Sequence, residues 1–323
     1  MLAVSCTSQS AEDPVSGLTV ADVPEPAVPD GWVRVRVRAA SLNHHDLWSL
    51  KGVGLPADRL PMILGCDAAG VTDDGDEVVV HALVGDPDWS GDETLDPRRT
   101  ILSERHQGTL AETVVVPRRN LVPKPAGLSF EEAACLPTAW LTAYRMLFTN
   151  AGLHPGDTVL VQGAGGGVAT AAIALARAAG LVVWATSRDQ QRRERALSLG
   201  AHEVYDSGAR LPGKVDAVIE TVGKATWSHS MRALRPGGTL VVSGATSGAD
   251  PSADLNRLFF LQLRVVGSTM GTRTELERLI ALCVTTGTRP LLDEVLPMGQ
   301  ARAGFERLAA GDVFGKVVLT LPA

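Results

Sequence analysis

A glycine-rich loop, Gly163-Ala-Gly-Gly-Gly-Val-Ala169, sets the fold class of this 323-residue chain. It directly follows an apolar run, Thr158–Gln162, that predicts a buried strand, and it leads into an alanine-rich helix over Val168–Ala179. Glycine permits the tight turn and lets a pyrophosphate approach the backbone, while the helix N-terminus offers free N–H groups to the anion. The loop therefore predicts a dinucleotide site formed by Gly165, Gly166, Gly167 and Val168.

From about residue 129 onward, strands and helices are expected to alternate. Ser129 to Glu132 is typical of a capping box, and a helix through about Asn150 should follow it. The expected strands beyond the loop are Leu181–Thr186, Val215–Glu220, Thr239–Ser243 and Arg264–Gly267. The expected helices are Asp189–Leu199, Trp227–Leu234 and Thr274–Thr285. This alternation predicts an α/β fold with a doubly wound parallel sheet.

The first 125 residues or so are instead rich in predicted strands. Val33–Arg38 alternates apolar and charged residues, which is the period of a half-buried strand. Glu77–His81 and Thr113–Pro117 predict further strands, and Met1–Cys6 reads as a first strand, because its apolar run is too short for a signal peptide. The polar stretch from Gly85 to Arg105 is expected to be an exposed loop.

The end of the second predicted strand of the α/β region indicates which nicotinamide cofactor binds. NAD enzymes usually carry an acidic residue there for the ribose 2′-hydroxyl, but this chain has Ser187 followed by Arg188. A carboxylate would repel a 2′-phosphate, whereas serine and arginine can bind one, so we expect NADP(H). Asp189 would be the ribose partner if the register differed by two residues. The next helix has three arginines that are expected on its solvated face: Arg192, Arg193 and Arg195.

Composition excludes several classes of partner. The net charge of −6 argues against a general nucleic-acid binder, because lysine and arginine lead that kind of binding. No apolar run is long enough to span a bilayer, so no membrane partner is expected. The four cysteines lie far apart and form no CxxC pair, which argues against a disulfide framework and fits a reducing, cytoplasmic location.

Motifs spread over nearly the whole chain resemble the medium-chain dehydrogenase/reductase superfamily. Besides the glycine loop they include Ala40–Asp46, Leu64–Gly70, Gly108–Glu112, Leu141–Tyr144, Leu234–Gly238 and Gly315–Val318. The resemblance implies a GroES-like, β-rich catalytic domain over residues 1–125, a Rossmann dinucleotide-binding domain over 126–287, and a return to the catalytic domain over 288–323. It also implies a homodimer or homotetramer built through the dinucleotide domain. The apolar segment Leu258–Leu261 belongs either to that interface or to the core.

The zinc-dependent branch of this superfamily holds its catalytic metal on Cys, His and Cys. The corresponding positions here are Asn43, Cys66 and Thr138, and the region expected to hold a structural zinc has no cysteine. Asparagine and threonine are poor zinc ligands, so we expect no metal. An atypical set of His44, His45, Cys66 and Asp67 is the alternative. The chain therefore resembles the zinc-independent, quinone oxidoreductase-like branch more closely.

The resemblance also assigns roles to individual residues. Asn43 is expected beside the nicotinamide, and Asp46 is placed with it although it more simply orders the loop. His45 is the best candidate proton donor; the alternatives are that His45 is a hydrogen-bonded structural residue and that solvent supplies the proton. Further cofactor contacts are expected from His44, Thr138, Thr142, Gly244, Gly267, Ser268 and Lys316. Related reductases often have a tyrosine acid where this chain has Trp48, so a tyrosine donor is not expected.

Together these features predict an NADP(H)-dependent oxidoreductase that transfers hydride to a small molecule, either a quinone or an activated C=C acceptor such as an enone. Because the cofactor carries the hydride, the protein must orient it and stabilise developing negative charge on the acceptor. Two alternatives remain from the sequence: a zinc-type alcohol dehydrogenase, and a nucleotide-binding sensor with little turnover. Fold alone does not separate them.

Overall fold

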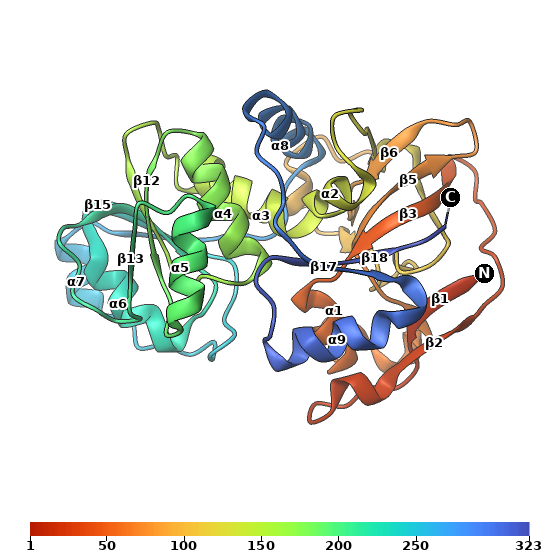
Figure 1. The fold of residues 1–323 in the computed structure, drawn as a ribbon, viewed down its shortest axis with the longest axis horizontal. Helices are drawn as coiled ribbons and strands as arrows, with labels where there is room; N and C mark the ends of the chain where they lie inside the picture. Colours follow the sequence, from red (N-terminus) through yellow and green to blue (C-terminus); the bar gives the residue numbers. More distant parts are fainter. Residues whose placement is uncertain (323) are drawn as a thin grey trace. The chain divides into compact units, whose positions relative to one another are not determined.

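The computed structural model describes residues 1–322, which divide into two compact units (Figure 1). Unit 1 comprises Met1–Ala139, Met270–Thr285 and the chain from Leu292 onward. Unit 2 comprises Trp140–Thr269 and Thr286–Leu291. The β-rich and the parallel-sheet regions that the sequence predicts are both present, in units 1 and 2 respectively.

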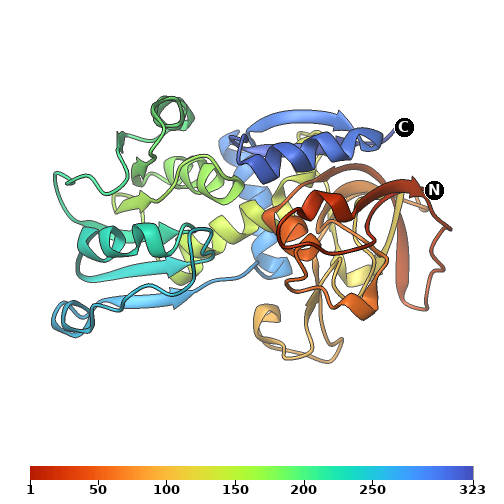
Figure 2. The ribbon, with the colours of Figure 1, turned by 90° about the horizontal axis from the view of Figure 1, so that it is seen from below.

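Unit 1 is built on a seven-stranded sheet in the order β10-β6-β5-β3-β18-β17, with β9 also paired to β3. Its strands are β3 (Trp32–Ser41), β5 (Asp67–Thr72), β6 (Glu77–Val80), β9 (Thr113–Pro117), β10 (Leu121–Pro123), β17 (Leu292–Pro297) and β18 (Lys316–Thr320). A three-stranded sheet contains β1 (Leu2–Cys6), β2 (Leu18–Asp22) and β4 (Met62–Ile63), and a small ribbon pairs β7 (Leu83–Val84) with β8 (Thr100–Ile101). The last strand, β18, pairs antiparallel with β3, so the first and the last strands both belong to this unit (Figure 2).

Apolar alternation explains the longest of these strands. Val33, Val35 and Val37 of β3 are buried in the core, as the period of two predicts. Unit 1 also has the helices α1 (His44–Leu50), α2 (Phe130–Ala134), α8 (Arg273–Thr286) and α9 (Ala301–Ala310). Of these, α2 packs on β3 and β5, although the sequence assigned it to the dinucleotide domain.

Unit 2 is a six-stranded sheet in the order β13-β12-β11-β14-β15-β16, and all of its pairings are parallel. The strands are β11 (Thr158–Val161), β12 (Val182–Thr186), β13 (Glu203–Tyr205), β14 (Val215–Glu220), β15 (Leu234–Val242) and β16 (Arg264–Gly267). The helices are α3 (Leu141–Tyr144), α4 (Gly167–Ala178), α5 (Gln190–Leu199), α6 (Lys224–Ala233) and α7 (Leu255–Phe260). As Figure 1 shows, α4 lies beside β12, and α6 packs on β14 and β15. This is the predicted doubly wound Rossmann sheet.

Two expectations about helices need correction. The single helix expected over 129–150 is instead α2 and α3 with wider π-helical turns at Leu136–Trp140 and Arg145–Asn150. Pro137 has no N–H, and in a regular α-helix its ring would clash with the carbonyl four residues earlier, so the first wider turn accommodates it. The expected helix near residue 280 is present as α8, but Met270–Thr285 belongs to unit 1. It is anchored there by a hydrogen bond of 2.9 Å between His81 and the carbonyl of Gly271.

Within residues 1–322, no helix has the length and apolar character needed to cross a bilayer. All four cysteines are free and buried. The polar stretch that follows Val84 is not entirely loop, because Thr100 and Ile101 pair with Val84 and Leu83.

Candidate functional site

The glycine loop adopts a conformation that only glycine can supply. The φ angles of Gly163 and Gly165 are +72° and +142°. A Cβ added at Gly163 would lie 2.6 Å from Val222 Cγ2, and one at Gly165 would lie 2.6 Å from Arg192 Nη1. Helix α4 begins at Gly167, and its N-cap, Gly166, has no side chain to cover the first N–H groups. The loop therefore presents a partly exposed helix N-terminus that suits a phosphate anion.

The residues on which the cofactor prediction rests follow strand β12. Ser187 follows the strand directly and its N–H donates to the carbonyl of Tyr205. Asp189, the alternative ribose partner, instead caps α5: its Oδ1 accepts from the N–H of Arg192 at 2.8 Å. Arg188 is exposed beside it. Ser187 is also engaged, because its Oγ accepts from the N–H of Asp189 at 3.2 Å, so these contacts leave both residues as candidates to face a ribose substituent.

Arg192 is a candidate cofactor residue that the sequence analysis placed on the solvated face of a helix. Its guanidinium instead reaches back over the phosphate loop, close to Gly165. The neighbouring Arg193 is bound to Asp206 and to the carbonyl of Ser187, so it points elsewhere. A guanidinium beside a phosphate loop can form charge-assisted hydrogen bonds with a phosphate. The sequence did contain a signal for this role: Arg192 lies in the first turn of α5, whose N-cap is Asp189.

Three of the remaining predicted residues of unit 2 lie near the carboxyl ends of strands. Gly244 follows β15 closely, and a Cβ there would lie 3.0 Å from the carbonyl oxygen of Thr221. Gly267 ends β16, and Ser268 donates its N–H to the carbonyl of Val242. Its hydroxyl is buried and has no hydrogen-bond partner among residues 1–322. Because parallel strands end at the same edge of the sheet, these residues share the edge where ligands collect. Thr142 is buried on α3.

In unit 1, the buried side chain of Lys316 contacts Asn43. Lys316 Nζ donates to Asn43 Oδ1 at 2.6 Å and to the carbonyl of Leu42 at 2.8 Å, and it lies 3.4 Å from Asp67 Oδ2. The same carboxylate oxygen accepts from Asn43 Nδ2 at 2.8 Å and from Ser41 Oγ at 2.6 Å. All three protons of the ammonium therefore have acceptors within the protein. This arrangement favours a structural role for Lys316 over the contact with the cofactor that the sequence analysis expected.

The superfamily's catalytic zinc does not fit the residues at its usual positions. The side chain of Asn43 is held by Asp67 and Lys316, and its amide is a poor zinc ligand. The hydroxyl of Thr138 is buried without a hydrogen-bond partner in the described part of the chain, and it is a weak ligand as well. Cys66 is the one good donor of the three.

A second group, His45, Asp46 and Cys66, has ligand atoms within 4.8 Å of one another. Both oxygens of Asp46 are already occupied, because Oδ2 accepts from the N–H of Asn43 at 2.8 Å and Oδ1 accepts from the N–H of Gly65 at 3.0 Å. Burial raises the pKa of this carboxyl to about 6. Asp46 therefore completes the capping box at the start of α1, whose N-cap is Asn43, and orders this loop.

The ring of His45 is held on both sides. Nδ1 lies 3.2 Å from Cys66 Sγ, and Nε2 lies 3.1 Å from Glu104 Oε1. Burial lowers the pKa of His45, but Cys66, Glu104 and the charge of Asp46 outweigh burial and hold that pKa well above its ordinary value. The imidazolium is thus the favoured form, which is what a proton donor requires. His44, by contrast, is exposed.

Comparison with known proteins agrees with both units. Residues 29–126 match the family model of the alcohol dehydrogenase GroES-like domain, and residues 167–285 match that of the zinc-binding dehydrogenases. A solved NAD-dependent alcohol dehydrogenase is 36% identical over the full length of both chains, with a TM-score of 0.93. The chain belongs to the medium-chain dehydrogenase/reductase superfamily. As a member it is an oxidoreductase.

Other members of the superfamily that resemble this chain act on enoyl thioesters, as their names state. A crotonyl-CoA reductase of Streptomyces avermitilis is 30% identical, over 90% of this chain and 79% of its own. A solved 2-octenoyl-CoA carboxylase reductase, in complex with NADP and 2-octenoyl-CoA, is 26% identical over 99% of this chain and 87% of its own, with a TM-score of 0.89. The chain also matches, at 32% identity, 14% of the length of a spectinabilin polyketide synthase system protein of Streptomyces orinoci.

Proposed function

We propose that this oxidoreductase is an NADP(H)-dependent reductase of activated C=C bonds, in an enoyl thioester or an enone, and that it works without zinc. The observation that carries this proposal is that the Asn43 side chain is hydrogen-bonded to Lys316 and Asp67, while the neighbouring His45 is held in its protonated form. A carbonyl reductase of the zinc type would need three good ligands at these positions. An acid near the acceptor assists a C=C reductase, and we assign that role to His45.

The cofactor preference rests on unit 2. The phosphate loop and the N-terminus of α4 would hold the pyrophosphate, and Ser187, Arg188 and Arg192 would hold the 2′-phosphate. Relatives solved with NADP support this assignment, whereas the NAD-dependent alcohol dehydrogenase does not. Bound NADPH supplies the hydride.

In this proposal the residues of unit 1 donate the proton and keep the neighbouring side chains in place. Hydride addition to the β-carbon of an enoyl acceptor leaves an enolate, which needs a proton at its α-carbon. His45 donates that proton as an imidazolium, and Asp46 fixes the start of the helix that carries His45. Lys316 and Asp67 keep Asn43 in one orientation. A quinone would accept hydride in the same way, with the proton going to oxygen, so quinones remain acceptors to be tested.

The test is an assay of the purified protein with NADPH and NADH against crotonyl-CoA, 2-cyclohexenone and a benzoquinone, each with and without a chelator. We expect oxidation of NADPH by the enoyl thioester or the enone, with no change on chelation. The reverse assay, alcohols with NADP+ or NAD+, serves as the comparison. Turnover limited to alcohols and lost on chelation would instead identify a zinc-type alcohol dehydrogenase, and preference for NADH would contradict the assignment of Ser187.

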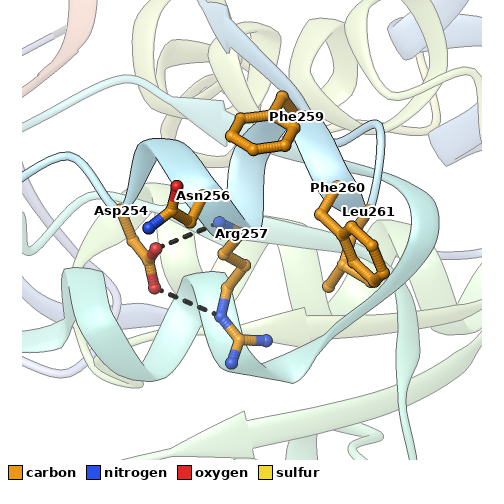
Figure 3. A pocket seen from close by; sticks show the side chains of 6 residues that line it. All are labelled: Asp254, Asn256, Arg257, Phe259, Phe260 and Leu261. Carbon is orange, nitrogen blue, oxygen red and sulfur yellow. Dashed lines mark hydrogen bonds and ion pairs between the residues drawn. The ribbon is translucent and has the colours of Figure 1, made fainter.

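We further propose that the small-molecule reductase is a homodimer that forms along the edge of the unit 2 sheet. Strand β16 pairs only with β15 among the described strands, so its other edge is open. Beside it on α7, Phe259 and Phe260 are 68% and 78% exposed, at a hollow also lined by Leu261, Asp254 and Arg257 (Figure 3). A second copy related by a twofold axis would present the same edge and the same rings, and so cover both.

Replacing Phe260 with glutamate should therefore convert the dimer to a monomer. A carboxylate placed in an apolar interface would have to lose its hydration without gaining a partner. The measurement is light scattering on a sizing column at several protein concentrations. Leu95→Glu is the matched control, because Leu95 is 68% exposed, compared with 78% for Phe260, but lies in unit 1, and this variant should stay dimeric. A wild-type protein that is monomeric at every concentration would refute the dimer.

A further inference from the structure

Glu104 is a carboxylate to which neither the sequence analysis nor the proposed reaction gives a role. It lies in the segment after Val84 that was expected to be an exposed loop, yet its Oε1 is 3.1 Å from Nε2 of His45. The other oxygen, Oε2, accepts from Thr100 Oγ1 at 3.2 Å and from the N–H of Ile101 at 3.3 Å. The carboxylate is therefore fixed in place by its own segment and directed at the imidazole ring.

The opposite edge of the ring meets a buried thiol. Cys66 Sγ lies 3.2 Å from Nδ1 of His45 and also contacts the carbonyl of Leu102 at 3.5 Å. Burial raises the pKa of this thiol. A carboxylate can only accept, so Nε2 carries a proton whenever Glu104 is ionised. The ring is thus held between the carboxylate of Glu104 and the sulfur of Cys66, and its orientation is determined at both nitrogens.

The accessible side of this cluster is the side of Glu104. The side chains of His45 and Glu104 are 19% and 23% exposed, whereas Cys66 is fully buried. The titratable groups that face the ring are Glu104, Cys66 and the carboxyl of Asp46, and the two oxygens of Asp46 are held by backbone N–H groups. The proton on Nε2 is therefore the one that can leave toward a bound substrate or be replaced from solvent.

We propose that Glu104 is the positioning residue of the proton donor: it fixes the His45 ring and keeps the proton on Nε2 until the acceptor becomes an enolate. This inference rests on the proposed function, because His45 must be the acid. In the step itself the N–H bond at Nε2 breaks, its electron pair returns to the ring, and a C–H bond forms at the α-carbon. Solvent then reprotonates the ring beside Glu104. Glu104 remains ionised throughout.

Glu104→Gln tests this role, because it keeps the shape of the side chain and removes its charge. Loss of the ionic contact should lower the pKa of His45, so the alkaline limb of the pH profile of kcat/KM should move about one pH unit lower. At pH 8 we expect kcat to fall about tenfold with little change in KM, because a tenfold loss corresponds to one such unit. Glu104→Asp keeps the charge and should recover part of the activity. Asp88→Asn is the matched control, since Asp88 is an exposed carboxylate in the same segment with no contact to His45, and its profile should match the wild type.

A second measurement does not depend on turnover. NMR titration of the His45 ring, assigned with a His45→Gln variant, should show a lower pKa in Glu104→Gln than in the wild-type protein. An unchanged His45 pKa, or an unchanged pH profile, would overturn the role of Glu104. If the wild-type protein reduces none of the acceptors while the NMR shift is present, the proposed function fails and the positioning contact stands. A melting temperature close to that of the wild type excludes unfolding as the cause of either result.

Discussion

Replacing Lys316 with methionine should lower the free energy of unfolding by about 3–5 kcal/mol, since removing one partner of a buried ion pair leaves an uncompensated charge. Lys316 is 2% exposed, and its partner Asp67 is completely buried. The ammonium also donates to Asn43 and to the carbonyl of Leu42, and methionine can replace neither contact. Urea denaturation of the wild-type and variant proteins at pH 7, followed by circular dichroism, measures the difference.

A double variant separates the lost charge from lost packing. Lys316→Met combined with Asp67→Asn removes both charges, so it should recover a large part of the loss, because a neutral buried pair carries no uncompensated ion. Arg118→Met is the surface control: Arg118 and Asp74 lie 3.9 Å apart and are both about 70% exposed. Exposed pairs of this kind contribute little, so this change should be small. A Lys316 variant as stable as the Arg118 variant would contradict the buried pair.

The sequence predicts this fold well because its strongest signals are local. The apolar run before Gly163 and the alanine-rich helix after it lie within a few residues of each other, and together they specify a strand, turn and helix. The alternation in β3 is also a local signal, because apolar residues mark the buried face of the strand and charged residues mark the opposite face. The elements that escaped prediction, such as α7 and β13, are short. Helix α7 has no buried residue, and β13 has one exposed and two half-buried residues, so neither shows the apolar pattern of a buried face.

The site was only partly predictable, because its contacts join residues far apart in the chain. Glu104 is 59 positions from His45, and Lys316 is 249 positions from Asp67. No rule of sequence spacing connects such pairs, so the sequence predicts that an acidic residue in a polar segment, such as Glu104, is exposed to solvent. The role of Asp46 in ordering its loop was expected, and its partner Asn43 lies only three residues away. Arg192 lies between these cases: its helix was predicted, but the direction of a long side chain was not.

Replacing Ser187 with aspartate should reverse the cofactor preference, lowering kcat/KM with NADPH roughly a hundredfold and raising it with NADH. A charge-assisted hydrogen bond contributes about 1.5–3 kcal/mol, and each 1.4 kcal/mol is a tenfold change. A carboxylate at this position both removes that bond and repels the 2′-phosphate, yet it can accept from the ribose 2′-hydroxyl of NADH. Initial rates with each cofactor at a fixed acceptor concentration give both values.

The arginines of α5 provide the matched pair that locates the phosphate contact. Arg192→Ala removes the guanidinium that lies beside Gly165, so KM for NADPH should rise about tenfold while KM for NADH changes much less. Arg195 is exposed on the same helix, and Arg195→Ala, with the same loss of charge, should leave both values near those of the wild type. If Arg192→Ala and Arg195→Ala had equal effects, Arg192 would contribute only through the positive charge of the helix and not through a specific contact with the phosphate. Equal effects of Arg192→Ala on NADPH and NADH would move its contact from the 2′-phosphate to the pyrophosphate, which both cofactors share.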